Sequence, residues 1–246
     1  MSIPPLRRQI VVAAPPDDAW RLFVDDIGRW WPLASHGCFG ADASLARAGG
    51  QLVETSPTGE RAVWGTITEE RRPERIAFTW HPGRGPEKAS AVLVEFTSCG
   101  DGTLVTLVHT GWEAHADPVA ARAEYAVGWM AVLGHYAEAA GEAAGTGPVW
   151  LVLEHTAGPA APAGGVFASP DFPKHLDFLR ALAADRALVA GGPLPDDPGS
   201  GMTVVRAMDI AQAARVARAA QVDDGAVRAG LLDVRVRPWR VAMTGA

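Results

Sequence analysis

One segment near the middle of the chain constrains the fold more than any other. Residues 117–144, DPVAARAEYAVGWMAVLGHYAEAAGEAA, carry a wide apolar stripe in which Tyr125, Trp129, Val132, Leu133 and Tyr136 recur at helical spacing. The segment follows a series of short extended runs, and a helix with so wide a stripe must bury it against another layer. A sheet that curls around this helix is the arrangement that we expect.

The residues before this helix supply the strands of such a sheet. Residues 7–14 read as a strand, and residues 15–30 read as a helix that begins with Pro and Asp. Glycine, proline and polar turns then separate five further apolar runs at hairpin-like intervals. These runs are residues 49–56, 61–72, 75–82, 89–98 and 102–112. The expected fold class is therefore α+β, with a curled antiparallel sheet around a long helix at the end of the domain.

The chain divides after the long helix, where three glycines and a proline lead from residue 135 to a new apolar run at 148–155. We place the boundary near residue 146, which gives domains of residues 1–145 and 146–246. The second half reads strand, helix, strand, strand, helix, strand, a pattern typical of ferredoxin-like domains. Its two helices are expected at residues 172–186 and 209–220.

Charge and cysteine content narrow the class of protein. The net charge is -6, and neither half carries a basic footprint for nucleic acid. No apolar run is long enough for a membrane helix and no signal peptide is evident, so a cytoplasmic location is expected. Cys38 and Cys99 lie too far apart in the sequence to form a CxxC motif. His36 and Cys38 have metal-ligand spacing but lack a third donor, and no glycine run has the spacing of a phosphate-binding loop. We therefore expect no metal, no cofactor and no disulfide.

The first half resembles the SRPBCC (START-like, helix-grip) superfamily, in the branch related to activators of the heat-shock chaperone ATPase. The resemblance covers about residues 6–142 and rests on an ordered series: VWGTITEERRPERIAFTWHPG, then GTLVTLVHTGWE, then GWMAVLGHY. It implies a deep cavity between the sheet and the helix, which members of the superfamily use for apolar ligands. It does not imply one reaction.

The second half, about residues 149–240, resembles the YCII-related family of small ferredoxin-like proteins. The resemblance rests on KHLDFLRALAADRALVAGGPL and DDGAVRAGLLDVRVRPW. It implies a His-Asp pair, here His175 and Asp224, and a homodimer formed through residues 149–240. This sequence departs from the family pattern at Gly225, where a proline is usual, and in lacking an arginine shortly before the histidine. A surface histidine and a solvated turn aspartate are an equally good interpretation of the pair.

Eight residues are candidates for lining the cavity of the first half: Trp30, Trp31, Trp64, Phe78, Trp80, His109, Trp112 and Trp129. Adjacent rings such as Trp30 and Trp31 cannot share one packing layer, so one of them is a candidate lid over the cavity. Ordinary core packing is the more common role for most of these residues and an equally good interpretation of the Trp30/Trp31 pair. Glu54 and Glu95 also interrupt apolar strands, and paired carboxylates act as acid and base only if they converge.

Two functions from different classes are consistent with these patterns. The first is a binding module that holds a small hydrophobic or aromatic molecule in the first domain, while the second domain dimerises or supplies another site. The alternative is a lyase- or isomerase-type enzyme in which His175 and Asp224 act on a cyclic or enolisable substrate. We favour the binding module.

Overall fold

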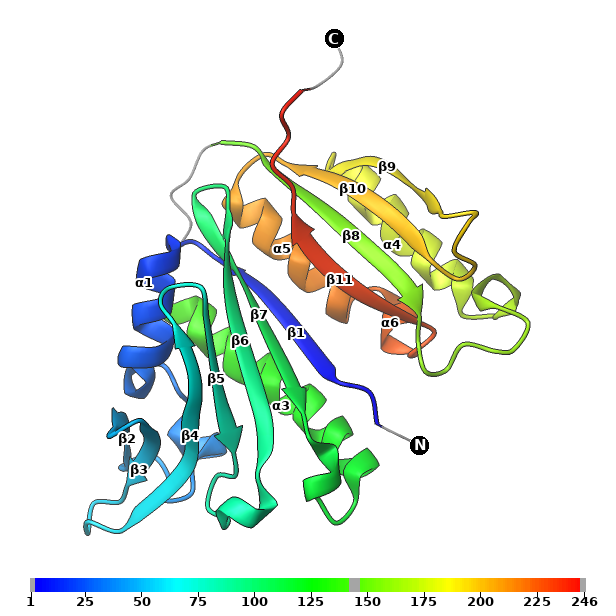
Figure 1. Ribbon diagram of the computed structural model, residues 1–246. Helices are drawn as coiled ribbons and strands as arrows, with labels where there is room; N and C mark the ends of the chain where they lie inside the picture. The colour runs from blue at the N-terminus through cyan, green and yellow to red at the C-terminus, as the bar shows by residue number, and fades with distance from the viewer. Residues whose placement is uncertain (1–2, 142–146, 244–246) are drawn as a thin grey trace. The chain divides into compact units, whose positions relative to one another are not determined.

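The computed structural model describes residues 3–141 and 147–243 (Figure 1). Within these residues the chain forms two compact units. The first contains residues 3–141 except 9–13 and 98–104, and those two short stretches group with residues 147–243 in the second. The domain boundary expected near residue 146 lies outside the described residues.

An antiparallel, curled sheet of seven strands, most of whose residues belong to the first unit, has the order β1-β7-β6-β5-β4-β3-β2 (Figure 1). The register shifts between Leu52 and Val53, and again between Ile67 and Glu69, which bends the strands locally. One short strand, β2, was not expected from the sequence. The strands are β1 (Leu6–Val12), β2 (Ser44–Ala48), β3 (Gln51–Thr55), β4 (Arg61–Arg71), β5 (Arg75–Trp80), β6 (Ser90–Cys99) and β7 (Gly102–Thr110).

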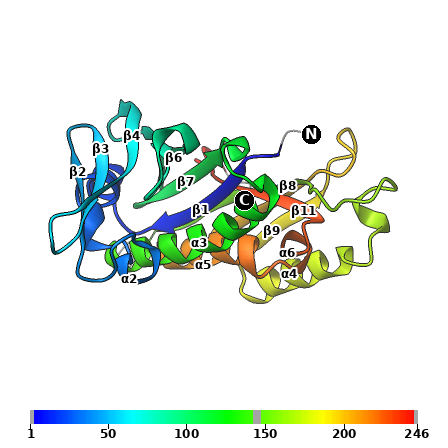
Figure 2. The same ribbon diagram turned by 90° about the horizontal axis from the view of Figure 1, so that it is seen from below.

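The predicted long helix is present as α3 (Pro118–Ala139), which lies on one face of this sheet (Figures 1 and 2). Asp117 caps its start, because the carboxylate accepts the backbone N–H of Ala120 at 3.0 Å. The apolar stripe is buried at Trp129, Val132, Leu133 and Tyr136. A curled sheet with a long helix is therefore confirmed.

Shorter helical pieces connect the strands of this unit. The helix expected over residues 15–30 is α1 (Pro16–Trp20), continued by a wider π-helical turn and then by a tight 3-10 turn. The shorter pieces are Arg21–Asp25, Ile27–Arg29, α2 (Leu33–His36), Pro86–Lys88 and Trp112–Ala114.

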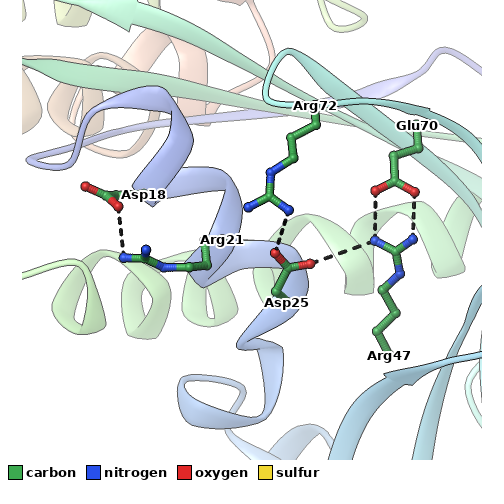
Figure 3. Close-up of polar contacts among 6 residues, drawn as sticks. All are labelled: Asp18, Arg21, Asp25, Arg47, Glu70 and Arg72. Atoms are coloured by element: carbon green, nitrogen blue, oxygen red, sulfur yellow. Dashed lines mark hydrogen bonds and ion pairs between the residues drawn. The ribbon is translucent and has the colours of Figure 1, made fainter.

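Exposed ion pairs join the π-helical turn to two strands (Figure 3). Asp25 accepts from Arg72 at 3.0 Å and lies 3.8 Å from Arg47, which also makes two hydrogen bonds to Glu70. The bonds from Arg47 lower the pKa of Glu70, and the bonds to Glu70 raise the pKa of Arg47. Exposed pairs of this kind contribute little stability each, so they orient the turn rather than hold the fold.

The second unit has four antiparallel strands in the order β11-β8-β10-β9, with α4 and α5 on one face (Figures 1 and 2). Inward side chains of β8, Leu151 and Leu153, pack with Phe178 and Leu182 of α4 and Val216 of α5. The elements are β8 (Val149–Ala157), Val166–Ala168, α4 (Phe172–Ala184), β9 (Leu188–Pro193), β10 (Gly201–Ala207), α5 (Ile210–Val222), α6 (Gly225–Arg228) and β11 (Leu232–Pro238).

No helix in residues 3–141 or 147–243 has the length and apolar character needed to cross a membrane.

Candidate functional site

The first unit contains a cavity of about 400 Å³, which we call the indole pocket. Its walls come from α2, the loop after β5, the turn at residues 112–115 and α3. The apolar wall consists of Trp31, Trp80, Trp129 and Val132. The polar side consists of Ser35, His36, Arg84, His115, Glu124 and Tyr125.

Three indole rings form the apolar wall and contact one another. The ring centroids of Trp80 and Trp129 lie 5.2 Å apart, and Trp31 lies 5.7 Å from Trp80 and 5.9 Å from Trp129. The Trp31 and Trp129 rings meet edge to face, a favoured geometry for aromatic pairs. Each ring is held by its neighbours, so this wall is preformed.

The sequence candidates divide between the pocket and the core. Trp31, Trp80 and Trp129 line the indole pocket, whereas the other five are buried outside its lining: Trp30, Trp64, Phe78, His109 and Trp112. Of the adjacent pair, Trp30 donates to the Leu22 carbonyl at 2.8 Å and packs on Phe23 and Tyr136. The two neighbouring rings therefore differ in position, one packed inward and one at the pocket.

His109 is fully buried and uses both ring nitrogens inside the core. Its Nδ1 accepts from the Trp129 indole at 3.0 Å, so Nε2 carries the proton and donates to Ser90 Oγ at 2.7 Å. The Ser90 hydroxyl in turn donates to the Trp80 carbonyl. Burial lowers the pKa of His109 to about 3, with His115 and Arg84 acting in the same direction. His109 thus holds the Trp129 indole directly, and through Ser90 it is linked to the backbone carbonyl of Trp80.

Sequence reasoning missed two polar residues of the pocket, Arg84 and His115. Arg84 Nη1 donates to His115 Nδ1 at 3.1 Å, which leaves the His115 proton on Nε2. The other guanidinium nitrogen, Nη2, and His115 Nε2 are both buried, and neither has a hydrogen-bond partner among the described residues. Burial and the charge of Arg84 lower the pKa of His115. This wall therefore presents two donors that require an acceptor.

Glu54 and Glu95 do not converge. Glu54 is fully buried in β3, where its carboxylate accepts the backbone N–H groups of Cys38 and Phe39 and the indole N–H of Trp64. Glu95 is partly exposed on β6, opposite Arg75. Three donors occupy the Glu54 carboxylate, so we assign it a structural role.

A second cavity, of about 290 Å³, lies in the second unit, and we call it the histidine pocket. His175, in the first turn of α4, donates from Nδ1 to Asp224 Oδ2 at 2.7 Å, although 49 positions separate them. Asp224 also caps α6 by accepting the Ala226 N–H through Oδ1. The residues of the predicted pair are therefore adjacent and buried, while their role in catalysis stays a prediction.

His155 also lines the histidine pocket and lies close to the His175–Asp224 pair, and sequence reasoning missed it. His155 Nε2 lies 3.9 Å from Asp224 Oδ2, and the rings of His155 and His175 are 4.6 Å apart. Burial is the largest cause that lowers the pKa of His155, to about 4, and His175 adds to the effect. Alternation along β8 places His155 on the same buried face as Val149, Leu151 and Leu153, a signal that was available in the sequence.

Among the described residues, His155, His175 and Asp224 form a group with donors close enough for a metal ion. Each offers one ligand atom, and these atoms lie within 4.8 Å of one another. His36 and Cys38, the other pair considered from the sequence, have different surroundings from this group. Cys38 is an exposed free thiol, and His36 Nδ1 forms a hydrogen bond with Ser35 Oγ.

Comparison with known proteins gives matches over the first part of the chain. The model of the family described as Activator of Hsp90 ATPase homolog 1-like protein matches residues 13–140. No curated protein matches the chain.

Several solved structures are similar over just over half of the chain. CalC from Micromonospora echinospora, described as a self-sacrificing resistance protein, is 24% identical over 56% of this chain and 94% of its own, with a TM-score of 0.44. The Aha1 dimer from Colwellia psychrerythraea is 16% identical over 56% and 96%, with a TM-score of 0.42. The family match spans just over half of the chain and contains the long helix and all strands of the curled sheet except β1. The chain therefore belongs to the Activator of Hsp90 ATPase homolog 1-like family of the SRPBCC superfamily.

Proposed function

We propose that the first unit binds a small aromatic molecule carrying a carbonyl or carboxylate oxygen, in the indole pocket. The observation that carries this proposal is the presence of two unpaired buried donors, Arg84 Nη2 and His115 Nε2, beside a wall of three indoles. The cavity of about 400 Å³ falls within the range of small-molecule sites. The pocket residues are Trp31, Trp80, Trp129, Arg84 and His115.

The two walls contribute differently to binding. The indole rings favour a flat apolar ligand, whose rings can stack or meet them edge to face. A buried donor without a partner costs about 1–3 kcal/mol, and a ligand oxygen placed between Arg84 and His115 recovers part of that cost. Glu124 is exposed on the rim of the pocket and repels additional negative charge. A single carboxylate or carbonyl therefore fits better than a phosphate.

We predict that 2-naphthoate binds to the indole pocket more tightly than naphthalene. Arg84→Gln should weaken the binding of 2-naphthoate about tenfold or more, because a hydrogen bond to a charged group contributes about 1.5–3 kcal/mol. Isothermal titration calorimetry measures both affinities. Binding of naphthalene should change little in the variant, since the indole wall is intact.

Arg61→Gln is the matched control, because Arg61 is an exposed arginine of the same unit and does not line the pocket. Its affinity for 2-naphthoate should equal that of the unaltered protein. Equal affinity of the Arg84→Gln variant would exclude Arg84 as the anchor, and absence of heat with either compound up to millimolar concentration would contradict the binding proposal.

We propose that the second unit is a YCII-related, ferredoxin-like domain, and that it forms a homodimer through residues 149–240. We also propose that the protein is cytoplasmic and that its two domains comprise residues 1–145 and 146–246. The order strand, helix, strand, strand, helix, strand supports the domain type, as does the sheet order of fourth, first, third and second strands. Light scattering after size exclusion is expected to give twice the chain mass of 25.8 kDa at micromolar concentration. A mass of one chain would contradict the dimer.

The comparisons do not favour the alternative, a lyase- or isomerase-type enzyme that uses His175 and Asp224. The family match ends at residue 140 and includes neither residue. The hydrogen bond between them supports a proton-transfer role in principle, since a carboxylate orients a histidine base in this way. The binding module remains the function that we propose.

A further inference from the structure

The histidine pocket contains a buried nitrogen whose surroundings are incomplete. His155 is 3% exposed, and its Nε2 is buried with no hydrogen-bond partner among the described residues. The His155 ring also makes a hydrogen bond to the backbone of Leu153, and this bond raises the pKa of His155. A bond that raises the pKa favours the protonated ring, so the ring contributes an N–H donor to it. Since Nε2 is the nitrogen without a partner, that donor is Nδ1. Nε2 then presents a lone pair.

The nearest charged group to this lone pair is a carboxylate. Asp224 is fully buried, and its Oδ2 lies 3.9 Å from His155 Nε2. A lone pair and a carboxylate oxygen both accept hydrogen bonds, so a donor or a cation between them is favoured in a buried site. Among the residues that the structure describes, the lining of the histidine pocket includes no lysine and no arginine that could supply this charge.

We infer that His155, His175 and Asp224 bind one divalent transition-metal ion of the zinc class at the wall of the histidine pocket. Two imidazoles and one carboxylate are the donor set of many catalytic zinc sites, which leave a fourth position open. His155 and His175 line a cavity of about 290 Å³, which has room for water or a small ligand at that position.

One of the three donors, His155 Nε2, is unpaired and ready to bind a metal, whereas His175 and Asp224 must first give up their mutual hydrogen bond. His155 Nε2 is buried without a hydrogen-bond partner, and an imidazole nitrogen with a free lone pair is the ligand form. The Ala226 N–H binds Asp224 at Oδ1, whereas Oδ2 accepts from His175 Nδ1 and is released to a metal only when His175 gives up that hydrogen bond. When the metal binds, the proton between His175 Nδ1 and Asp224 moves to His175 Nε2. The donor atoms, now within 4.8 Å of one another, must also move closer together.

The test uses the full chain after removal of metals with EDTA. Addition of Co²⁺ should give the visible absorption bands of a four-coordinate site, and one equivalent of Zn²⁺ should displace them. His155→Gln and His175→Gln should each weaken Co²⁺ binding by more than about 100-fold, beyond the 10- to 100-fold effect typical of residues outside the ligand shell. Asp224→Asn retains the cap of α6 and should also lose the bands.

Two controls separate this site from other thiol and histidine sites. Cys38→Ser removes the exposed thiol, and His135→Gln removes an exposed histidine, so both should keep the bands. Absence of bands in the unaltered folded protein at millimolar Co²⁺ would overturn the inference whether or not the variants fold. Bands that survive in folded His155→Gln, or that disappear with Cys38→Ser, would overturn it as well.

Discussion

Replacing Glu54 with alanine is expected to lower the free energy of unfolding of the first unit by about 3–5 kcal/mol, because each buried donor left unpaired costs about 1–3 kcal/mol. The carboxylate accepts from Cys38 N at 2.7 Å, from Phe39 N at 2.8 Å and from the Trp64 indole at 3.0 Å. Alanine leaves all three without a partner. Urea denaturation followed by tryptophan fluorescence measures the loss.

The same substitution should also disturb the indole pocket. Trp64 contacts Trp31 at a ring centroid distance of 5.0 Å, and the Trp31 indole donates to the carbonyl of His36, next to the loop that Glu54 holds. A Glu54→Ala protein that still folds should therefore bind 2-naphthoate more weakly. The indirect effect follows from packing, since Glu54 itself does not line the pocket.

Two variants show whether the three hydrogen bonds cause this loss. Glu54→Gln keeps one carbonyl oxygen but turns an NH₂ group toward a donor, so its loss should be intermediate. Glu95→Ala removes a strand glutamate that is partly exposed and should cost less than about 1 kcal/mol. If Glu54→Ala were as mild as Glu95→Ala, the structural role that we assign to Glu54 would be wrong.

The sequence predicts the long helix and most strands because their burial follows a simple period. The stripe through Trp129, Val132, Leu133 and Tyr136 repeats every three or four residues, and β8 alternates from Val149 to His155. This periodicity does not predict the burial of Glu54. The register shift between Leu52 and Val53 breaks the alternation of β3, so Leu52, Val53 and Glu54 are all buried.

The candidate sites depend on contacts that no periodicity reports. Adjacency in the sequence predicts that the Trp30 and Trp31 side chains point in different directions, but which ring reaches the pocket depends on the turns between Asp26 and Pro32. Arg84 lies in a loop, and its partner His115 is 31 positions later, after β6 and β7. The His175 and Asp224 pair was available only through family resemblance, because sequence separation says nothing about contact between α4 and α6.

Acid is expected to destabilise the first unit through His109. The unfolded chain has a histidine of ordinary pKa, near 6.5, whereas burial keeps the folded His109 neutral down to about pH 3. Below pH 6.5 the unfolded state therefore binds more protons, and the free energy of unfolding falls as the pH decreases toward 3. The slope is about 1.4 kcal/mol per pH unit, or about 3 kcal/mol between pH 6.5 and pH 4.

The contribution of His109 can be isolated by comparison with His109→Gln, since a glutamine amide can accept from Trp129 and donate to Ser90 but does not titrate. Urea denaturation at a series of pH values measures the free energy of unfolding of both proteins. At pH 7 the variant should be the less stable of the two. Between pH 6.5 and pH 4, however, its free energy of unfolding should fall by about 3 kcal/mol less than that of the unaltered protein. Seven of the nine tryptophans lie between residues 20 and 129, so fluorescence reports on this unit.

His135→Gln provides the matched comparison, because it makes the same substitution at a half-exposed histidine of α3. Arg84 and His115, the charged and titratable groups that lower the pKa of His109 besides burial, are unchanged in both variants. Parallel slopes for His109→Gln and the unaltered protein would mean that the folded state takes up a proton at His109. The hydrogen bond from the Trp129 indole would then be absent, because a doubly protonated ring has no acceptor for it.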